Sequence, residues 1–455
     1  MSLDGSPYQG YLYAYPHKTA YRRLEPRPLL EDVWAGEGSE ALFAYVHVPF
    51  CEMRCGFCNL FTRVRPPAEQ VTGYLAQVAR QASAARAALG PQARFARTAI
   101  GGGTPTYLTA PELEELFGVI EGTLGATGVP VTVETSPATA TPDRLAVLKA
   151  HGVTRVSIGV QSFVEAEARA AVRPQKLQEV TAALEAIRSA GVPALNIDLI
   201  YGIDGQTRDS WQHSLDQALR WRPEELFLYP LYVRPLTGLG RRAPAGSVAS
   251  ALSAVDLGPS ARSGSAAVSG SPAVSGSSAA SGSPADPGSS AVSGDSAWDE
   301  QRLELYRHAV RVLTDAGYVQ QSMRQFRRAD VPVEDGPDYS CQDDGMVGLG
   351  VGARSYTSDL HYSFDYAVSA AEVRAVIDDY VSRPAEDFRH AEFGYRLDEG
   401  EQRRRWLLKS VLRADGVDVD QHQTRSLEDA RLAACTAAGS VDAVVAVGGD
   451  GTVGA

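Results

Sequence analysis

Short apolar stretches alternate with helix-like stretches from Leu42 to about Tyr229, and this alternation restricts the possible folds more than any other feature. Strands are predicted at residues 42–48, 97–100, 131–134, 155–160, 195–202 and 226–229. Helices are predicted near residues 68–89, 111–124, 142–151, 176–190 and 208–221. Such alternation is typical of parallel strands joined by helices. The sequence therefore predicts an α/β fold with a partial (β/α)6 barrel of the TIM type, and a doubly wound sheet is the alternative.

After residue 242 the composition changes to serine, glycine, alanine, proline and valine, without an aromatic residue before Trp298. Such a segment cannot bury enough apolar surface to fold, so a disordered insertion is predicted. An amphipathic pattern from Trp298 to Gly317 then predicts a helix. We therefore divide the chain into a tyrosine-rich strap (1–40), the barrel (41–242), a linker (243–297) and a smaller C-terminal α+β accessory region (298–455).

Three of the five cysteines lie close together directly after the first predicted strand, at Cys51, Cys55 and Cys58. Three thiolates suit a 4Fe-4S cluster, because one iron is then left open for another ligand. An open iron can chelate the amino and carboxylate groups of S-adenosylmethionine (SAM). One electron then releases a 5′-deoxyadenosyl radical, so the cofactors supply the difficult chemistry.

A structural zinc site is the alternative for these cysteines. Zinc usually takes four ligands from paired C-x2-C units, which the C-x3-C-x2-C spacing does not provide. His47 could supply a fourth ligand, whereas Cys341 and Cys435 are single and have no paired spacing. The spacing favours the cluster.

Polar residues follow the next predicted strands at the same edge of the sheet. A glycine-rich turn, "GGGTPT" (101–106), follows the second strand, Glu134 ends the third, Gln161 ends the fourth, and Asp198 lies in the fifth. Active sites of TIM-type barrels lie at the carboxyl ends of the strands. We therefore expect these residues and the cysteines to meet at one rim, with backbone amides of the turn available to a carboxylate or ammonium group.

The overall charge and the distribution of cysteines limit the partners and the location. A net charge of −12 argues against a general nucleic-acid-binding protein, because phosphate binding needs a basic surface. No apolar run approaches the roughly 20 residues of a membrane span, and the N-terminus lacks the pattern of a signal peptide. Few cysteines, most of them clustered, indicate a reducing cytoplasm.

Four motifs in order resemble the radical SAM family of oxygen-independent coproporphyrinogen III oxidase and its heme-chaperone relatives. They are "YVHVPFCEMRCGFC", "GGGTPTYL", "GVTRVSIGVQSF" and "NIDLIYGIDGQT". The resemblance runs from about Ala41 to Arg242 and resumes from Trp298 to about Tyr356. It implies a radical SAM barrel with a 4Fe-4S cluster on the three clustered cysteines, and Phe57, before the last of them, belongs to the signature.

The resemblance also implies a set of SAM contacts by motif position. Tyr45, Gly102, Gly103, Thr104 and Glu134 match positions that contact SAM. Gln161, Arg173 and Asp198 match positions that face a second SAM molecule in the oxidase, and a purely structural role for Gln161 and Asp198 stays open.

Three departures separate this chain from either relative. The oxidase carries a further cysteine two residues after the third ligand, where this chain has Leu60. The heme chaperone carries a histidine motif where this chain reads "GPDYSCQDDGMVGLGVGARSY" (336–356), although Cys341 could be an axial heme ligand. The N-terminal segment "YQGYLYAYPHKTAYRRL" (8–24) is unlike both, and either lines a substrate pocket or packs on the barrel as a strap.

The sequence therefore predicts a radical SAM enzyme, an oxidoreductase of the coproporphyrinogen-oxidase-like class, with a small-molecule substrate for which a tetrapyrrole is a candidate. An electron donor such as flavodoxin or ferredoxin is expected. A heme-binding chaperone, the oxidase itself and a zinc-stabilised interaction protein are the alternatives. The last residues, "VDAVVAVGGDGTVGA" (441–455), resemble the nucleotide loop of diacylglycerol and NAD kinases. Without the rest of such a domain, we interpret this as chance or an aberrant C-terminus.

Overall fold

The computed structural model describes residues 15–234, 237–242, 292–332, 345–367 and 369–413. Six parallel strands lie side by side in chain order. They are β2 (Leu42–Val48), β5 (Phe95–Gly102), β6 (Val131–Thr135), β7 (Val153–Gln161), β8 (Ala194–Tyr201) and β9 (Glu225–Pro230). All six predicted strands are present. Their sequential order confirms the partial barrel over the doubly wound sheet, in which the strand order reverses.

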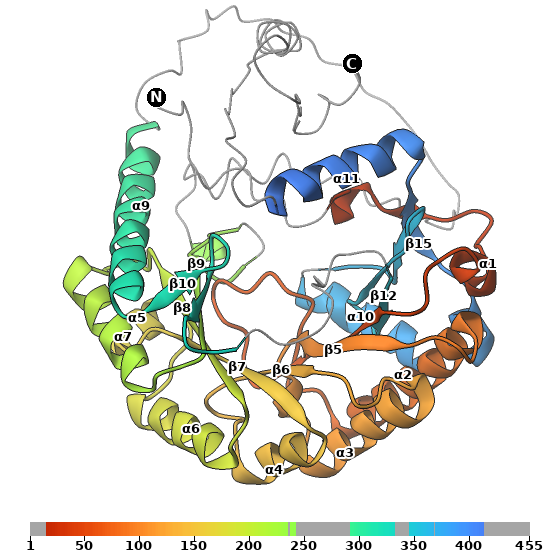
Figure 1. Ribbon diagram of the computed structural model, residues 1–455, viewed down its shortest axis with the longest axis horizontal. Helices are drawn as coiled ribbons and strands as arrows, with labels where there is room; N and C mark the ends of the chain where they lie inside the picture. Colours follow the sequence, from red (N-terminus) through yellow and green to blue (C-terminus); the bar gives the residue numbers. More distant parts are fainter. Residues whose placement is uncertain (1–14, 235–236, 243–291, 333–344, 368, 414–455) are drawn as a thin grey trace, which may run out of the picture.

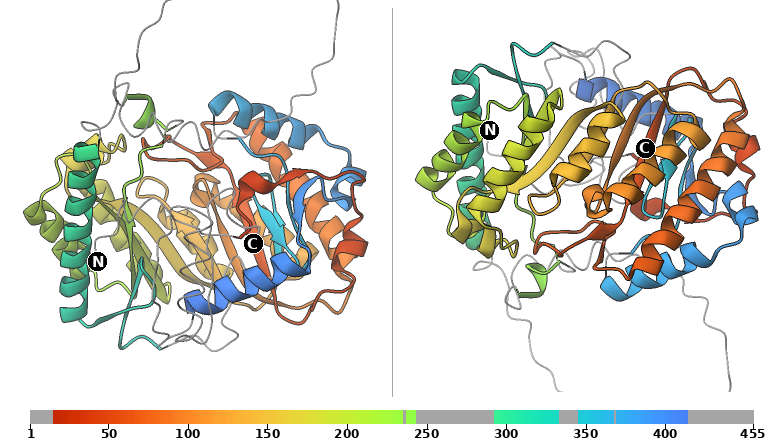
Figure 2. Two further views of the ribbon diagram at one scale, coloured as in Figure 1. Left: turned by 90° about the horizontal axis from the view of Figure 1, so that it is seen from above. Right: turned by 90° about the horizontal axis from the view of Figure 1, so that it is seen from below.

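Helices between these strands form an outer arc over one face of the sheet (Figure 1). They are α2 (Ala68–Leu89), α3 (Ala110–Gly118), η3 (Val119–Leu124), α4 (Pro142–Ala150), α5 (Glu165–Ala170), α6 (Leu177–Ala190) and α7 (Arg208–Arg220). Seen from below, these helices lie in front of the strands (Figure 2, right). The single helix predicted near 111–124 is α3 continued by the π-helical turn η3. It ends where Gly125 adopts a φ of 84°, which glycine tolerates without steric cost.

Strand β7 shows how the sequence separates the two faces of the sheet. Val156, Ile158 and Val160 are fully buried in the core beneath the helices. Arg155 and Gln161 alternate with them and point to the opposite side, because successive side chains of a strand face opposite ways. We call this opposite side of the six parallel strands the inner face. It carries the polar residues of the candidate site.

Strands from the C-terminal part extend the same sheet at both edges. Beside β2 lie β12 (Met346–Leu349, parallel), β13 (Arg354–Tyr356), β14 (Leu360–Ser363), β15 (Phe393–Arg396) and β1 (Arg22–Arg23). Beside β9 lie β11 (Gln325–Arg328) and β10 (Tyr318–Gln320), both antiparallel. The helices of this part are α9 (Val292–Asp315), α10 (Ala370–Ser382), η6 (Ala385–Arg389) and α11 (Glu399–Arg413). The accessory region is therefore α+β, but its strands pair with the barrel edges, whose backbone groups would otherwise lack partners.

The boundary between the predicted linker and the next helix lies earlier than expected. Helix α9 begins at Val292, before the predicted start at Trp298. The composition pattern placed the boundary at the first aromatic residue, whereas residues 293–296, "SGDS", contain serine and aspartate, which favour helix starts. The rest of the predicted linker, residues 243–291, lies outside the described residues.

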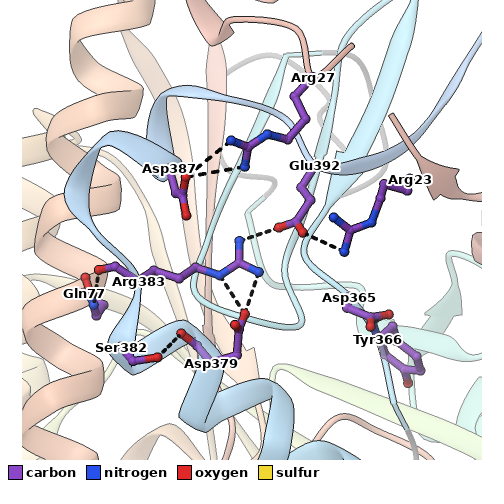
Figure 3. A network of polar contacts seen from close by, with 10 residues as sticks. All are labelled: Arg23, Arg27, Gln77, Asp365, Tyr366, Asp379, Ser382, Arg383, Asp387 and Glu392. Atoms are coloured by element: carbon purple, nitrogen blue, oxygen red, sulfur yellow. Dashed lines mark hydrogen bonds and ion pairs between the residues drawn. The ribbon is translucent and has the colours of Figure 1, made fainter. Parts of the chain in front are cut away.

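The described part of the N-terminal strap packs on the accessory region (Figures 1 and 3). Its strand β1 pairs with β15, and its helix α1 (Leu30–Trp34) follows. The buried Glu392 carboxylate forms two ion pairs, one with Arg383 and one with Arg23 of the strap, the latter at 3.3 Å. Arg27 pairs with Asp387 at 3.4 Å. These ion pairs attach the strap to the edge of the sheet.

Within the part of the chain that the structure describes, no helix is both long enough and apolar enough to cross a lipid bilayer.

Candidate cluster and cofactor site

The three clustered cysteines lie in one loop at the carboxyl end of β2. Cys51 is buried at the end of the short strand β3 (Phe50–Cys51), which pairs with β4 (Arg63–Val64), and Cys55 and Cys58 are half-buried. Burial, with a smaller effect of the nearby Cys58 and Cys55 thiols, raises the pKa of Cys51 to about 12, although the hydrogen bond with Thr104 opposes the increase. Burial and then the Cys55 thiol also raise the pKa of Cys58. The sulfur atoms are thus close enough to influence one another electrostatically.

Backbone contacts hold this loop in place around Gly56. The Gly56 amide donates to the carbonyl of Ala171 at 3.1 Å, and its carbonyl accepts from the amide of Leu239 at 2.8 Å. A Cβ atom at Gly56 would lie 2.7 Å from Cβ of Val172, so a side chain has no room there. The loop is therefore clamped between the chain after α5 and the segment that leads into η4 (Gly240–Arg242).

The glycine-rich turn after β5 lies against the cysteine loop, but its amides are already engaged. The amide of Gly102 donates to Oε2 of Glu134 at 3.1 Å. The amides of Gly103 and Thr104 donate to the carbonyls of Val48 and Phe50 at 2.7 and 2.8 Å. The prediction that this turn offers bare amides is therefore wrong, because Glu134, the end of β2 and the start of β3 accept from these three donors. The hydroxyl of Thr104 lies 3.5 Å from Sγ of Cys51.

His47 connects the cysteine loop to Tyr45. Its Nε2 lies 3.0 Å from the carbonyl of Phe61, to which it donates, and its Nδ1 lies 3.3 Å from the hydroxyl of Tyr45, from which it accepts. Burial lowers the pKa of His47 to about 4, and the nearby Arg354 cation contributes to the decrease, so the ring is neutral. Gly102, with a φ of 110°, leaves room for this ring, since a Cβ there would approach it to 2.6 Å. Both ring nitrogens have partners other than the cysteines, which fits a positioning role.

Arg173 joins the cysteine loop to the end of β7. Its Nη1 donates to Sγ of Cys55 at 3.3 Å, and its Nη2 donates to the carbonyl of Gly159 at 2.7 Å. Gln161 ends the strand with a φ of 69°, a left-handed conformation that is uncommon for glutamine. A Cβ at Gly159 would meet the Gln161 amide at 2.7 Å. Strained residues of this kind often occur at functional sites.

Two carboxylates, Glu134 on β6 and Asp198 on β8, lie on the inner face. Burial raises the pKa of Asp198 to about 7, a hydrogen bond from Asn196 and the Arg155 cation oppose the increase, and the Glu134 charge adds to it. The Glu134 residue is exposed at the inner face, but burial of its carboxyl group among protein atoms raises its pKa. The hydrogen bond from the Gly102 amide and the Arg155 cation oppose this increase. Both carboxyl groups are thus less acidic than usual.

Phe57 packs against the small apolar cluster of Ala171, Ile200, Ile203 and Leu231, whose Ile200 lies on the same face of β8 as Asp198. This contact fixes the loop between the last two cysteines. Leu60 is 48% exposed after the third cysteine. Cys341 and Cys435 lie outside the described residues.

Several inner-face residues were missed from the sequence. Arg155 donates to Glu225 on β9 at 2.7 Å and lies over the ring of Phe227, 5.5 Å from its centre. Arg324 lies over the ring of Tyr229 at 5.2 Å. The alternation of side chains along β7 and β9 could have shown that Arg155, Phe227 and Tyr229 lie together on the inner face. Only the pairing of β11 with β9 brings Arg324 to it.

Comparison with known proteins shows what the region around this site resembles. The family model of the radical SAM superfamily matches residues 45–218, which contain the cysteine loop and strands β5 to β8. The solved structure of coproporphyrinogen III oxidase (HemN) from Escherichia coli, described as a radical SAM enzyme, superposes with a TM-score of 0.65. That superposition covers 88% of this chain and 82% of the oxidase at 22% identity, so it establishes the fold. Residues 45–218 thus match the radical SAM superfamily, and the fold is that of the oxidase.

Curated relatives confirm the more specific resemblance. The anaerobic coproporphyrinogen III oxidase 1 of Cereibacter sphaeroides is 31% identical over 186 residues, 41% of each chain. The heme chaperone HemW of Bacillus subtilis is 33% identical over 196 residues, 43% of this chain and 51% of the relative. HemW of Escherichia coli is 31% identical over 209 residues, 45% of this chain and 54% of the relative. The matches span about half the length of these relatives, and they include both the oxidase and the chaperone.

A second family model, the diacylglycerol kinase catalytic domain, matches residues 398–455. This match begins well before the glycine-rich run at 441–455, so the interpretation of that run as a chance resemblance is not supported. Residues 414–455 lie outside the described residues.

Proposed function

We propose that this protein is a radical SAM enzyme that binds a 4Fe-4S cluster through Cys51, Cys55 and Cys58. The observation that carries the proposal is that the three thiols share one loop at the carboxyl end of β2, where Cys51 contacts Thr104 of the glycine-rich turn. Among the described residues, no group of three or more histidine, cysteine or acidic side chains is arranged around one metal ion. A cluster does not require that arrangement, because its thiolates bind separate iron atoms.

The residues around the cysteines are suited to hold SAM. When bound, the cluster and SAM together supply a 5′-deoxyadenosyl radical. In our proposal the Thr104 hydroxyl and the carbonyls of the turn accept hydrogen bonds from the SAM ammonium group, since the amides of Gly102 and Gly103 already have partners. Glu134 fixes the turn through the Gly102 amide. As the resemblance implies, Tyr45 contacts SAM, and a second SAM molecule is faced by Gln161, Arg173 and Asp198. Phe57 acts through the cysteine loop that it anchors.

An aromatic and cationic wall on the inner face supports a planar, anionic substrate. Arg155 and Arg324 lie over the rings of Phe227 and Tyr229, and stacked guanidinium groups and rings bind flat anions well. Tyr229 has a raised pKa because of burial and the neighbouring carboxylates, so it stays a neutral hydrogen-bond donor. We propose a tetrapyrrole-like small molecule as the substrate. The reaction class is then that of a coproporphyrinogen-oxidase-like oxidoreductase in the cytoplasm.

Heme binding without turnover is the second candidate, because two of the compared relatives are named heme chaperones. One experiment separates the two. The protein is reconstituted anaerobically with iron and sulfide, reduced with dithionite and assayed for 5′-deoxyadenosine with and without porphyrinogens. Formation of 5′-deoxyadenosine by wild type, and none by Cys55→Ala, supports the enzyme. One heme per chain with no SAM cleavage would instead assign the chaperone.

A further inference from the structure

A basic pocket lies beside one cysteine of the loop. It has a volume of about 340 Å³ and is lined by Arg54, Cys55, Val172, Gly238, Arg241 and Arg242. Three of these six residues are arginines, and Arg241 and Arg242 are exposed. The exposed side chain of Met53 stands next to Arg54 in the chain. The pocket is thus a cationic surface with an apolar residue beside it.

This pocket and the inner face meet at Cys55. On the inner side, Cys55 contacts Arg173, which also binds the carbonyl of Gly159. Cys55 also lines the pocket. A group bound by Cys55 would therefore be within reach of both the cofactor side and the protein surface.

The placement of the arginines is fixed by the fold. Arg54 lies in the cysteine loop, one residue before Cys55. Arg241 and Arg242 belong to η4, and the preceding Leu239 donates its amide to Gly56 at 2.8 Å. A Cβ at Gly238 would lie 3.2 Å from Cα of Gly56, so the two backbones are in close contact. The fold thus holds three arginines in one pocket with Cys55.

We propose that this pocket is the docking surface for a small acidic one-electron carrier protein. The inference rests on the proposed cluster, which must receive one electron from outside for each SAM cleaved. One electron leaves the reduced carrier and enters the cluster, and no atom is transferred. The chain as a whole carries a net charge of −12, so an acidic partner is attracted only where basic residues are concentrated. Electron-transfer complexes are small and weak, and their encounter is steered by charge.

The test uses the full-length, cluster-loaded protein and a purified acidic flavodoxin. The variant is Arg241→Glu/Arg242→Glu, and the matched control is Arg220→Glu/Arg374→Glu, the same change of charge at exposed sites on α7 and α10. Calorimetric titration at low salt should give a dissociation constant at least tenfold higher for the variant than for wild type or the control. The salt dependence of binding should also be weaker. The rate of cluster reduction by flavodoxin should fall by a similar factor, whereas the rate with dithionite should not change.

Each outcome identifies what has failed. If the variant loses cluster, Arg241→Gln/Arg242→Gln is measured in its place, with a smaller change expected in the same direction. The variant and the control could bind flavodoxin with equal affinity and be reduced by it at equal rates. That result would overturn the proposed docking surface and leave the cluster proposal intact. Equal slowing with flavodoxin and dithionite would also overturn it, since a docking surface affects only the protein donor. A wild-type protein that binds no cluster would overturn the proposed function, and this inference with it.

Discussion

The guanidinium group of Arg173 donates to Sγ of Cys55 at 3.3 Å and to the carbonyl of Gly159 at 2.7 Å, so one side chain connects the cysteine loop to β7. A fixed positive charge beside a cluster ligand stabilises the reduced, more negative form of the cluster. The charge of Arg173 should therefore raise the reduction potential.

Replacing Arg173 with Gln should lower the potential of the reconstituted cluster by about 50 to 100 mV. This corresponds to roughly 1–2 kcal/mol for one electron, a reasonable value for a partly buried charge at short distance. A redox titration followed by electron paramagnetic resonance measures the potential. Arg220→Gln, on the outer helix α7, is the control and should leave it unchanged. An unchanged potential in Arg173→Gln would show that the contact with Cys55 has no electrostatic effect.

Replacing Cys51, Cys55 or Cys58 with Ala should abolish both the cluster and cleavage of SAM, because all three thiolates are needed to hold it. Cys341→Ala and Cys435→Ala should each retain about one cluster per chain. Iron and sulfide analysis, with the absorbance of the cluster, provides the measurement. Loss of the cluster in either of the last two variants would contradict the ligand assignment.

Replacing residues 243–291 with a short Gly/Ser linker should leave the cluster content unchanged and shift the Tm only slightly. Flexible connections cost little, since each doubling of loop length changes the closure free energy by about 0.6 kcal/mol. The replacement ends at residue 291 because α9 begins at Val292. Thermal unfolding followed by circular dichroism tests this, and a large loss of soluble protein would show that the segment contributes to the core.

His151 should make stability depend on pH. Its Nδ1 and Nε2 contact Glu121 and Glu114 at 2.9 and 2.8 Å, and its ring stacks on Phe117. Partial burial lowers the pKa of His151, but the hydrogen bonds and charges of the two glutamates outweigh it, so the pKa is raised overall. A raised folded-state pKa stabilises the fold below the unfolded-state value of about 6.5, and the contribution disappears as the pH rises through the folded-state pKa.

The free energy of unfolding of the wild type is compared with that of His151→Gln, measured by urea unfolding at pH 6 and pH 9. The wild type should be more stable than the variant by about 1 kcal/mol at pH 6, and this difference should decrease at pH 9. A difference that stays constant with pH would assign the contribution to the ring stacking on Phe117 alone.

Coproporphyrinogen III should not be decarboxylated efficiently. The family members that catalyse that reaction carry a cysteine where this chain has the exposed Leu60, which has neither a thiol nor a charge. We expect uncoupled SAM cleavage when coproporphyrinogen III and a reductant are supplied without oxygen. Chromatography of the products decides: protoporphyrinogen at several turnovers per enzyme would restore the oxidase assignment.

The barrel could be predicted from the sequence because each of its strands is a short apolar run between helices. For α2 and β2 even the end residues agree with the prediction. The accessory strands could not be placed, because β10 to β15 contain only three or four residues each. The pairs that attach them to the barrel, β12 with β2 and β11 with β9, join segments far apart in the sequence. The engaged amides of Gly103 and Thr104 also escaped prediction, because their acceptors, the carbonyls of Val48 and Phe50, lie in a separate part of the chain.

The parallel pairing of β12 with β2 has a consequence during synthesis on the ribosome. Val48 ends β2, and Met346, which begins β12, follows roughly 300 residues later. At about 5–20 residues per second, the cysteine-bearing edge of the nascent sheet waits on the order of 15 to 60 seconds for its neighbour. During that interval an open strand edge lies beside three reduced thiols, and exposed edges pair readily with other chains. Slow translation or oxidising conditions should therefore reduce the yield of soluble protein before they affect the completed fold.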